Sequence, residues 1–479
     1  MLAIHKRLAG VAVLAALAGV AAAVPASAAP GGSHGKPTDG VPAKVVSAYF
    51  ADWDVYGRGY YVKDIPADKL NVIQYAFANP VYDPTTGAVG CNVVDPWADY
   101  QQPYTADMSV DGVADDSANP DQHLYGNFNQ LMKLKQEHPD LKIEISVGGW
   151  SLSKWFSTIA STPALRSSFV ASCIDTFIKG NLPGGGWPAS AGGDAAAAGL
   201  FDGIDIDWEY PTQLADGNVN YGPVDRHNAT LLAAEFRKQL DAYGKTTGKH
   251  YLLTWALPAA TSATNYYELR SISKYLDWDN VMAYDYNVPG GTVAAPDTLF
   301  TRDPRDPNAS DRTWNTVGTV NLYLRSGVPA SKIVVGVPFY GNQYLNVGPK
   351  NHGLYSSFDS TGLDPNSLTA DSAPQPTYHE LVDGSGYVNA TGTTGANGYS
   401  VYWDAFAGEP YLYSPAADHP SLTTGDATTS TVITFSSPAS IAERTALVKV
   451  LNLRGAMAWE ISQDSDSHAL ISALSPILQ

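Results

Sequence analysis

The sequence predicts an α/β fold: a (β/α)8 TIM barrel with a small α+β insertion between the seventh strand and the seventh helix. Eight short β-rich apolar runs alternate with amphipathic helical patterns or long loops, and polar residues stand at the end of nearly every run. A doubly wound open sheet also alternates strands and helices. The open sheet does not explain why polar residues stand at the end of nearly every strand, whereas a barrel gathers such residues at its carboxyl-terminal face.

The first 28 residues have the composition of a bacterial secretory signal peptide. A basic head at residues 5–7 precedes an apolar run, which ends in the cleavage pattern Ala26-Ser27-Ala28. A membrane anchor is the alternative, but the run is short for a bilayer span. Residues 29–42 are rich in Gly, Pro and Ser and are predicted to form a flexible leader. We therefore expect a secreted, extracellular protein.

The catalytic barrel is predicted over residues 43–479. Helical patterns such as 127–138 and 228–244 separate its strands. Residues 79–124 are too long for a plain connection and are expected to form a loop that shapes the upper face. Residues 342–436, rich in Gly, Thr, Ser and Tyr, are predicted to be the insertion domain. The eight strands are expected at residues 44–50, 71–77, 142–149, 201–209, 251–258, 279–285, 332–341 and 455–460.

Composition narrows the class of partner. The formal net charge is -18, which disfavours nucleic acid and anionic membranes. Only 16% of residues are charged, whereas Tyr (28) and Trp (11) are abundant, a combination that suits stacking on sugars. There is no HExxH motif and the ten histidines are scattered, so no metal and no cofactor is expected. Cys91 lies in the long loop and Cys173 in a helical stretch, and the sequence leaves open whether they pair.

The stretch LFDGIDIDWEYP, residues 200–211, places carboxylates inside an apolar strand. Side chains alternate along a strand, so Asp205, Asp207 and Glu209 share one face and the apolar residues between them share the other. On a barrel strand we expect the carboxylates to point inward. Glu209 then stands at the carboxyl end, where such barrels place their chemistry.

Three carboxylates in one row cannot all ionise cheaply, because each like charge raises the pKa of its neighbours. A proton shared along the row would keep Glu209 neutral, as a general acid requires, with Asp207 as its partner. The alternative is a purely structural row, bonded to Ser, Tyr and backbone donors inside the barrel.

These residues resemble a known family. DGIDIDWE is similar to the DxxDxDxE signature of glycoside hydrolase family 18, the chitinases, and the resemblance covers residues 41–479. SVGGW at 146–150, MAYD at 282–285 and GAMAWE at 455–460 match further family motifs in the same order. SAYFADWDVYGRGY near the start and VYWDAFAGEPYLY in the insertion are similar to bacterial secreted members that carry an α+β insertion.

The resemblance implies a retaining, substrate-assisted mechanism. Glu209 would protonate the glycosidic oxygen while the 2-acetamido group of the sugar attacks its own anomeric carbon, giving an oxazolinium ion. Asp207 would orient the acetamido nitrogen, and Asp205 would tune Asp207 through the shared proton. Tyr284 would hydrogen-bond the acetamido oxygen, and Asp285 would contact the distorted sugar.

Further site residues are expected around this row. Asp202, at the entry of the strand, is expected to be structural, and Ser146 and Tyr49 are expected to bond to the aspartates. One departure concerns Asn342, which follows GVPFYG where the family commonly has an arginine that touches substrate. Substrate contacts are expected from Trp53, Gly148, Gly149, Trp150, Met282, Trp403 and Trp459.

The expected function is a secreted chitinase that cuts β-1,4 bonds between N-acetylglucosamine units, an endo-acting monomer acting on chitin and its oligomers. The sequence leaves endo or exo preference, processivity and direction open. One alternative is an endo-β-N-acetylglucosaminidase on N-glycans, which would use the same acid. Another is a non-catalytic chitin-binding lectin on the same fold, although such proteins usually lose the acid that is present here as Glu209.

Overall fold

The computed structural model describes residues 40–417 and 429–479. The predicted signal peptide (1–28) and nearly all of the predicted leader (29–42) lie outside the described residues. The described chain divides into two compact units. The N-terminal unit contains the residues up to Leu257 and Ala263–Asn280, and the C-terminal unit contains Pro258–Ser262 and the residues from Val281 onward.

Each of the eight predicted barrel strands is present. The strands are hydrogen-bonded in the order β1-β13-β8-β7-β6-β5-β4-β2, and β1 also pairs with β2, which closes the sheet. The pairs β1–β2, β2–β4, β4–β5, β5–β6 and β8–β13 are parallel. The predicted (β/α)8 barrel is therefore confirmed. Its strands are β1 (Val45–Ala51), β2 (Val72–Tyr82), β4 (Lys142–Gly148), β5 (Gly203–Asp207), β6 (Leu252–Pro258), β7 (Trp278–Met282), β8 (Ile333–Pro338) and β13 (Gly455–Trp459).

Local sequence explains where the helices begin and end. Helix α4 starts after Thr162, whose hydroxyl accepts the N–H of Leu165, and Pro163 occupies its first turn. Helix α5 ends at Gly248, which has a φ of 72°. The helices are α2 (Gly126–Glu137), α3 (Phe156–Ala160), α4 (Pro163–Cys173), α5 (Asp225–Thr247), α6 (Ala260–Tyr266), α7 (Leu269–Ile272), α8 (Thr316–Arg325), α9 (Pro438–Val450) and α10 (Ala469–Leu474).

Part of the predicted long loop, 79–124, is a strand rather than a loop. β2 extends to Tyr82, and β3 (Val89–Val93) pairs with it antiparallel. The turn between them is stabilised by Asp83, whose carboxylate accepts the N–H of Thr85, and by Gly87 with a φ of 74°. The placement of Cys91 in a loop was therefore wrong, because Cys91 belongs to β3.

Cys91 and Cys173 form a disulfide, with their Cα atoms 4.9 Å apart. The bond joins β3 to the last residue of α4, in agreement with a second contact in which the N–H of Cys91 donates to the Ser172 hydroxyl. The question that the sequence left open is thus answered by the hairpin, which brings Cys91 beside the helix.

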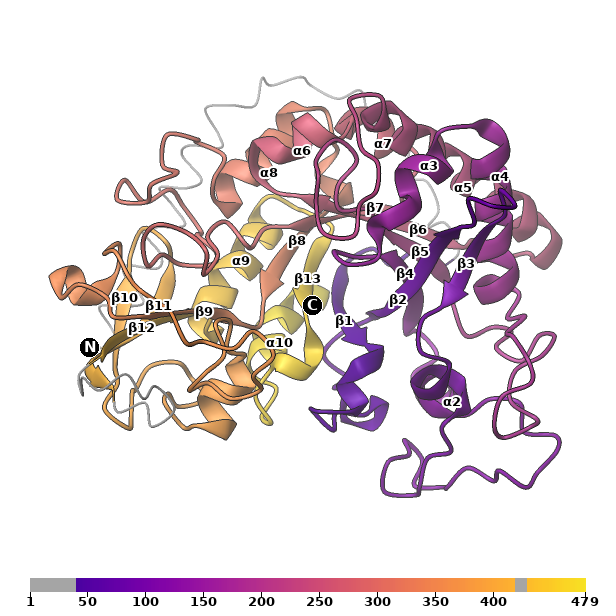
Figure 1. Cartoon of the computed structure of the whole chain (residues 1–479), viewed down its shortest axis with the longest axis horizontal. Coiled ribbons are helices and arrows are strands. Elements are labelled where there is room, and N and C mark those ends of the chain that lie inside the picture. Colours follow the sequence, from indigo (N-terminus) through magenta and orange to yellow (C-terminus); the bar gives the residue numbers. More distant parts are fainter. Residues whose placement is uncertain (1–39, 418–428) are drawn as a thin grey trace. The chain divides into compact units, whose positions relative to one another are not determined.

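In the C-terminal unit a second sheet follows β8, within the stretch predicted to be the insertion. Its antiparallel order is β10-β11-β12-β9, drawn in orange in Figure 1. Tyrosines and aliphatic residues fill its core, among them Tyr344, Leu354, Tyr411 and Val432. The bounds are β9 (Gly341–Leu345), β10 (Ser400–Asp404), β11 (Glu409–Ala417) and β12 (Thr429–Phe435). Among the helices that the structure describes, none has the length and apolar character needed to cross a membrane.

We expect the disulfide to stabilise the N-terminal unit. The bond closes a sequence separation of 82 residues. Replacing both Cys91 and Cys173 by Ser should therefore lower the free energy of unfolding by about 2–4 kcal/mol. Urea unfolding monitored by tryptophan fluorescence measures this loss. The same unfolding midpoint for the double variant and the oxidised wild type would contradict the expectation.

Candidate active site

The residues expected at the site fall into two groups, one in each unit. The N-terminal unit holds the acid row on β5 and its neighbours, and the C-terminal unit holds the group that follows β7 together with Trp403 and Trp459.

The acid row follows the alternation predicted for β5. Asp205 and Asp207 are 0% and 4% exposed, and Glu209, two residues beyond the strand, is half-buried. On the opposite face Trp208 is fully buried, and its ring stacks on Phe156 with the centroids 5.4 Å apart. The apolar side chains of the strand thus pack under the helices, and the carboxylates lie on the other face.

Asp205 is held by four side-chain donors. Its Oδ2 accepts the hydroxyls of Tyr49 and Ser146, both at 2.8 Å. Its Oδ1 accepts the hydroxyl of Thr254 at 2.7 Å and the amide of Asn280 at 3.1 Å. Burial raises the pKa of Asp205, while these hydrogen bonds act in the opposite direction. These four donors favour the ionised form of Asp205, and Asp207 has no comparable set of donors.

Asp207 has the opposite environment. One of its oxygens, Oδ1, is buried and receives no hydrogen bond. Burial, and then the charges of Glu209 and Asp205, raise the pKa of Asp207 well above its usual range. This environment favours the protonated form of Asp207.

The carboxyl end of β5 is fixed by the segment after β4. Gly149 donates its N–H to the carbonyl of Asp207 at 2.8 Å, and Ser153 accepts the N–H of Glu209 at 2.8 Å. Gly148 has a φ of 109°, and a Cβ there would lie 2.3 Å from the carbonyl oxygen of Asp207. Glycine is thus required because the two backbones meet closely.

Two of the predicted tryptophan platforms are open to solvent. Trp53 is 47% exposed and Trp150 is 50% exposed, and the ring of Trp53 lies 6.1 Å from that of Phe77. Exposed aromatic rings of this kind are suited to stacking on sugars.

Asp202 does not join the row. Its carboxylate pairs with Lys135 at 2.7 Å and accepts the N–H of Ile143 at 3.0 Å, so it ties α2 and β4 to the entry of β5. Its contacts fit the structural role expected for it.

Sequence reasoning missed several polar residues around the row. Glu144 on β4 is fully buried, and burial and the charge of Asp205 raise its pKa well above the usual range. Thr254 bridges Glu144 and Asp205, and Asn280 contacts Asp205 from β7. The alternation in KIEIS, residues 142–146, does place Glu144 on the same face as Ser146. Ser153, Thr254 and Asn280 gave no comparable pattern.

In the C-terminal unit, Tyr284 and Asp285 follow β7. The Tyr284 ring meets that of Tyr340 edge-on with the centroids 6.4 Å apart, and the Tyr340 hydroxyl donates to Asp285 Oδ1 at 2.8 Å. Met282 ends β7 and is half-buried. Trp459, which ends β13, and Trp403, on β10, are also half-buried.

Asn342 lies within the protein and is 0% exposed. Its amide donates to the carbonyl of Asn287 at 2.7 Å, and its Oδ1 accepts the amide of Gln375 at 3.3 Å. In this chain the position joins the loop after β7 to β9 and offers no side chain to solvent.

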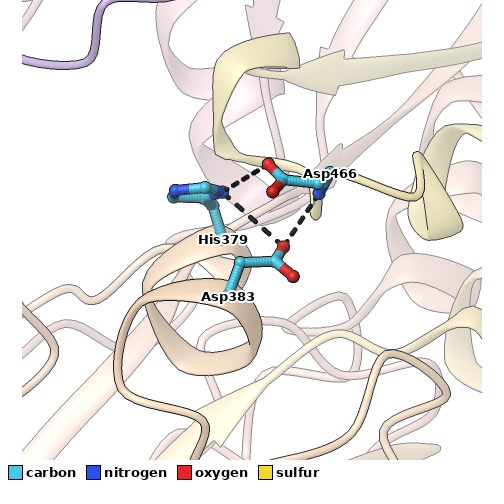
Figure 2. A group of neighbouring side chains, drawn as sticks. All are labelled: His379, Asp383 and Asp466. Atoms are coloured by element: carbon cyan, nitrogen blue, oxygen red, sulfur yellow. Dashed lines mark hydrogen bonds and ion pairs between the residues drawn. The ribbon is translucent and has the colours of Figure 1, made fainter.

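Within the described part of the chain, one set of three side chains has metal-ligand atoms close together. Figure 2 shows His379, Asp383 and Asp466 converging. His379 Nδ1 lies 3.7 Å from Asp383 Oδ2 and 3.4 Å from Asp466 Oδ1, and the Asp466 side chain is 78% exposed. A surface contact between the His379 ring and two carboxylates, one of which also accepts the N–H of Asp466, explains this arrangement, and we assign no cation to it.

Comparisons with known proteins agree with the motifs. The sequence profile of the family Glycosyl hydrolases family 18 matches residues 45–464. The chain is 33% identical to chitinase A1 from Niallia circulans over 448 residues, covering 88% of this chain and 56% of that protein. It is 36% identical to chitinase C from Streptomyces lividans over 345 residues, covering 69% of this chain and 48% of that protein. The chain spans about half the length of these two relatives.

The fold is shared as well. The catalytic domain of psychrophilic chitinase B from Arthrobacter TAD20 superposes with a TM-score of 0.76 at 32% identity, covering 92% of this chain and 97% of that domain. The profile match over most of the chain, the relatives and the shared fold show that the chain belongs to glycosyl hydrolases family 18.

Proposed function

We propose that this chain hydrolyses the β-1,4 bonds between N-acetylglucosamine units of chitin. The observation that carries the proposal is the acid row, in which half-buried Glu209 stands at the carboxyl end of β5 beyond buried Asp205 and Asp207. Of the three acids in the row, Glu209 is the most accessible to a substrate, which supports its role as the acid. Relatives named chitinases support chitin as that substrate.

The proposed mechanism is substrate-assisted and retains the anomeric configuration. Glu209 donates a proton to the glycosidic oxygen as the bond to the leaving sugar breaks. The acetamido oxygen of the substrate bonds to the anomeric carbon and forms the oxazolinium ion. Water then opens this ion while Glu209 takes a proton back. The burial of Asp207, 4% exposed, supports a mechanism in which no protein carboxylate attacks the sugar.

The remaining acids control charge in this proposal. Asp207 orients the acetamido N–H and stabilises the positive charge that develops there. It must give up its proton to do so, and Asp205 accepts or returns that proton. The four donors on Asp205 support this role because they allow it to ionise inside the barrel.

The proposed roles of the site residues in the C-terminal unit are based on the family motifs. We propose that Tyr284 hydrogen-bonds the acetamido oxygen, that Asp285 contacts the distorted sugar, and that Trp459 forms the floor beneath it. Met282 lines the site, and Trp403 joins Trp53, Trp150, Gly148 and Gly149 as substrate contacts.

We further propose an endo-acting, secreted monomer. The exposed rings of Trp53 and Trp150 suit a long chain that extends over several sugars. The Cys91–Cys173 disulfide supports an oxidising, extracellular location, together with the composition of residues 1–28.

Replacing Glu209 by Gln should lower kcat on N-acetylglucosamine oligomers by about 10²–10⁴, because the general acid is lost. Release of reducing ends, with chromatography of the products, measures this change. Glu137→Gln at the exposed end of α2 is the matched control and should keep wild-type activity.

Equal product release by Glu209→Gln and the wild type would refute the role of Glu209. Cleavage of N-glycans but not of chitin oligomers would identify an endo-β-N-acetylglucosaminidase. Binding of oligomers without any release by the wild type would identify a lectin.

Replacing Asp207 by Asn should lower kcat by about 10²–10³, because an electrostatic partner of the oxazolinium ion is lost. The fold should remain intact, since a neutral amide of the same shape replaces a carboxyl that is already protonated. Steady-state kinetics and thermal unfolding measure the two effects, and full activity in Asp207→Asn would contradict the assisted mechanism.

Oligomers of glucosamine, which lack the acetyl group, test the same mechanism from the substrate side. The wild type should not cleave them, because they carry no acetamido oxygen to attack the anomeric carbon. Mass spectrometry of the products after long incubation checks this expectation. Cleavage at a rate similar to that of the acetylated oligomers would require a protein nucleophile.

A further inference from the structure

Asp285 has a second carboxyl beside it that the sequence motifs do not include. Asp285 is exposed and has a φ of 54°, whereas Asp297, from the loop after β7, is only 3% exposed. Both residues lie in the C-terminal unit. Burying the carboxyl of Asp297 next to Asp285, which we propose to contact the sugar, costs free energy unless Asp297 is paired or protonated.

The segment containing Asp297 is bound to the end of β7 at three points. Asp297 Oδ2 accepts the N–H of Asp285 at 3.3 Å, and the Asp297 carbonyl accepts the N–H of Tyr286 at 2.9 Å. The Thr298 hydroxyl donates to the carbonyl of Ala283 at 2.8 Å. The backbone of Asp285 is therefore fixed by its neighbour 12 positions along the chain.

The other oxygen of Asp297 decides the protonation of the pair. Asp297 Oδ1 is buried and accepts no hydrogen bond, so an ionised Asp297 would leave part of its charge uncompensated. With a proton, the Asp297 carboxyl becomes a donor, and the carboxylate of Asp285 is the acceptor beside it. Burial and the charge of Asp285 raise the pKa of Asp297 well above its usual range.

Asp285 is the member that can carry the negative charge. Protein surrounding its carboxyl raises the pKa of Asp285, although one edge of the residue is open to solvent. Hydrogen bonds from Asp297, Tyr340 and Gln375 act in the opposite direction. Each of these donors favours the ionised form of Asp285.

Other titratable groups near Asp297 do not supply the proton. The tyrosines around it are Tyr286, Tyr340 and Tyr344, and burial raises the pKa of each, so they stay neutral. Glu409 on β11 contacts Arg444, and its charge acts on Asp297 in the same direction, raising the pKa of Asp297 further. The proton and the charge of this cluster therefore belong to the Asp285–Asp297 pair.

We propose that Asp297 is a positioning residue, which holds the proton of the pair and donates it in a hydrogen bond to Asp285, so that Asp285 stays ionised and oriented toward the sugar. The inference rests on the proposed function, because it assumes that Asp285 meets the sugar. Asp297 itself contacts no substrate.

Two substitutions at Asp297 should have different effects on the acid limb of the pH profile of kcat/KM. In Asp297→Asn the amide still donates to Asp285 and cannot lose its proton, so the acid limb should stay in place or move to lower pH. In Asp297→Leu the donor is lost, so Asp285 takes up a proton more readily and the limb moves to higher pH. On the acid side, kcat/KM of the Leu variant should fall by about tenfold relative to wild type.

Thr298→Val is the matched control, since it removes a buried hydrogen bond of the same loop without touching either carboxyl. Its acid limb should coincide with that of the wild type. Equal displacement of the acid limb in Asp297→Asn, Asp297→Leu and Thr298→Val would overturn the proposal, because it would show that any change in this loop has the same effect. No displacement in any of the three variants would overturn it as well, because Asp297 would then have no influence on the protonation of Asp285.

Binding provides a readout that does not require turnover. In the Glu209→Gln background, calorimetry of N-acetylglucosamine oligomers across pH should show weakened binding at a higher pH for Asp297→Leu than for Asp297→Asn. A wild type that fails to cleave oligomers would refute the proposed function, and the binding series would still test the pair. Binding profiles that are identical for both Asp297 variants would overturn the inference.

Discussion

The interior of this barrel contains buried carboxyl groups, and each of them must be either hydrogen-bonded or protonated, because an unpaired buried charge is costly. Asp205 meets this constraint with donors from four other strands, β1, β4, β6 and β7. Asp207 has a buried oxygen without a donor, and burial and neighbouring charge both favour its protonated form. The difference between adjacent acids on one strand gives the row a direction, with the hydrogen-bonded Asp205 at its inner end and the half-buried Glu209, the proposed acid, at its outer end. In the proposed mechanism, the polar residues that surround the row therefore influence which acid is ionised.

Much of this arrangement follows from local sequence. The period-2 alternation in residues 203–209 correctly predicts the face of each acid, and the alternation of strands and helices predicts the barrel. The sequence does not predict which side chains reach Asp205 from other strands, since Thr254 and Asn280 become its neighbours only when the sheet closes. For the same reason the Cys91–Cys173 pair could not be decided. It depends on the β2–β3 hairpin, and the turn residues after Tyr82 were assigned to a loop.

Asn342 shows how a departure from a family pattern acquires a structural meaning. In the sequence, Asn342 stands where the family commonly has an arginine that contacts substrate, so the sequence alone indicates that this contact is missing. In the fold it is a buried amide that holds the carbonyl of Asn287 and the side chain of Gln375, whose own amide reaches Asp285. The side chain of Asn342 on β9 therefore links the loop after β7 to Gln375 and, through Gln375, to the exposed Asp285. Asp297, further along that loop, accepts the backbone N–H of the same acid, Asp285, and neither Asn342 nor Asp297 belongs to a recognised motif.

The disulfide also determines how the protein is best produced. Its two sulfurs come from segments that are made far apart in time, since Cys173 leaves the ribosome 82 residues after Cys91. A reducing cytosol keeps both thiols apart, and a preparation from that compartment contains an N-terminal unit without its covalent tie between β3 and α4. Production in an oxidising compartment yields the cross-linked enzyme, and the two preparations differ in their content of free thiols.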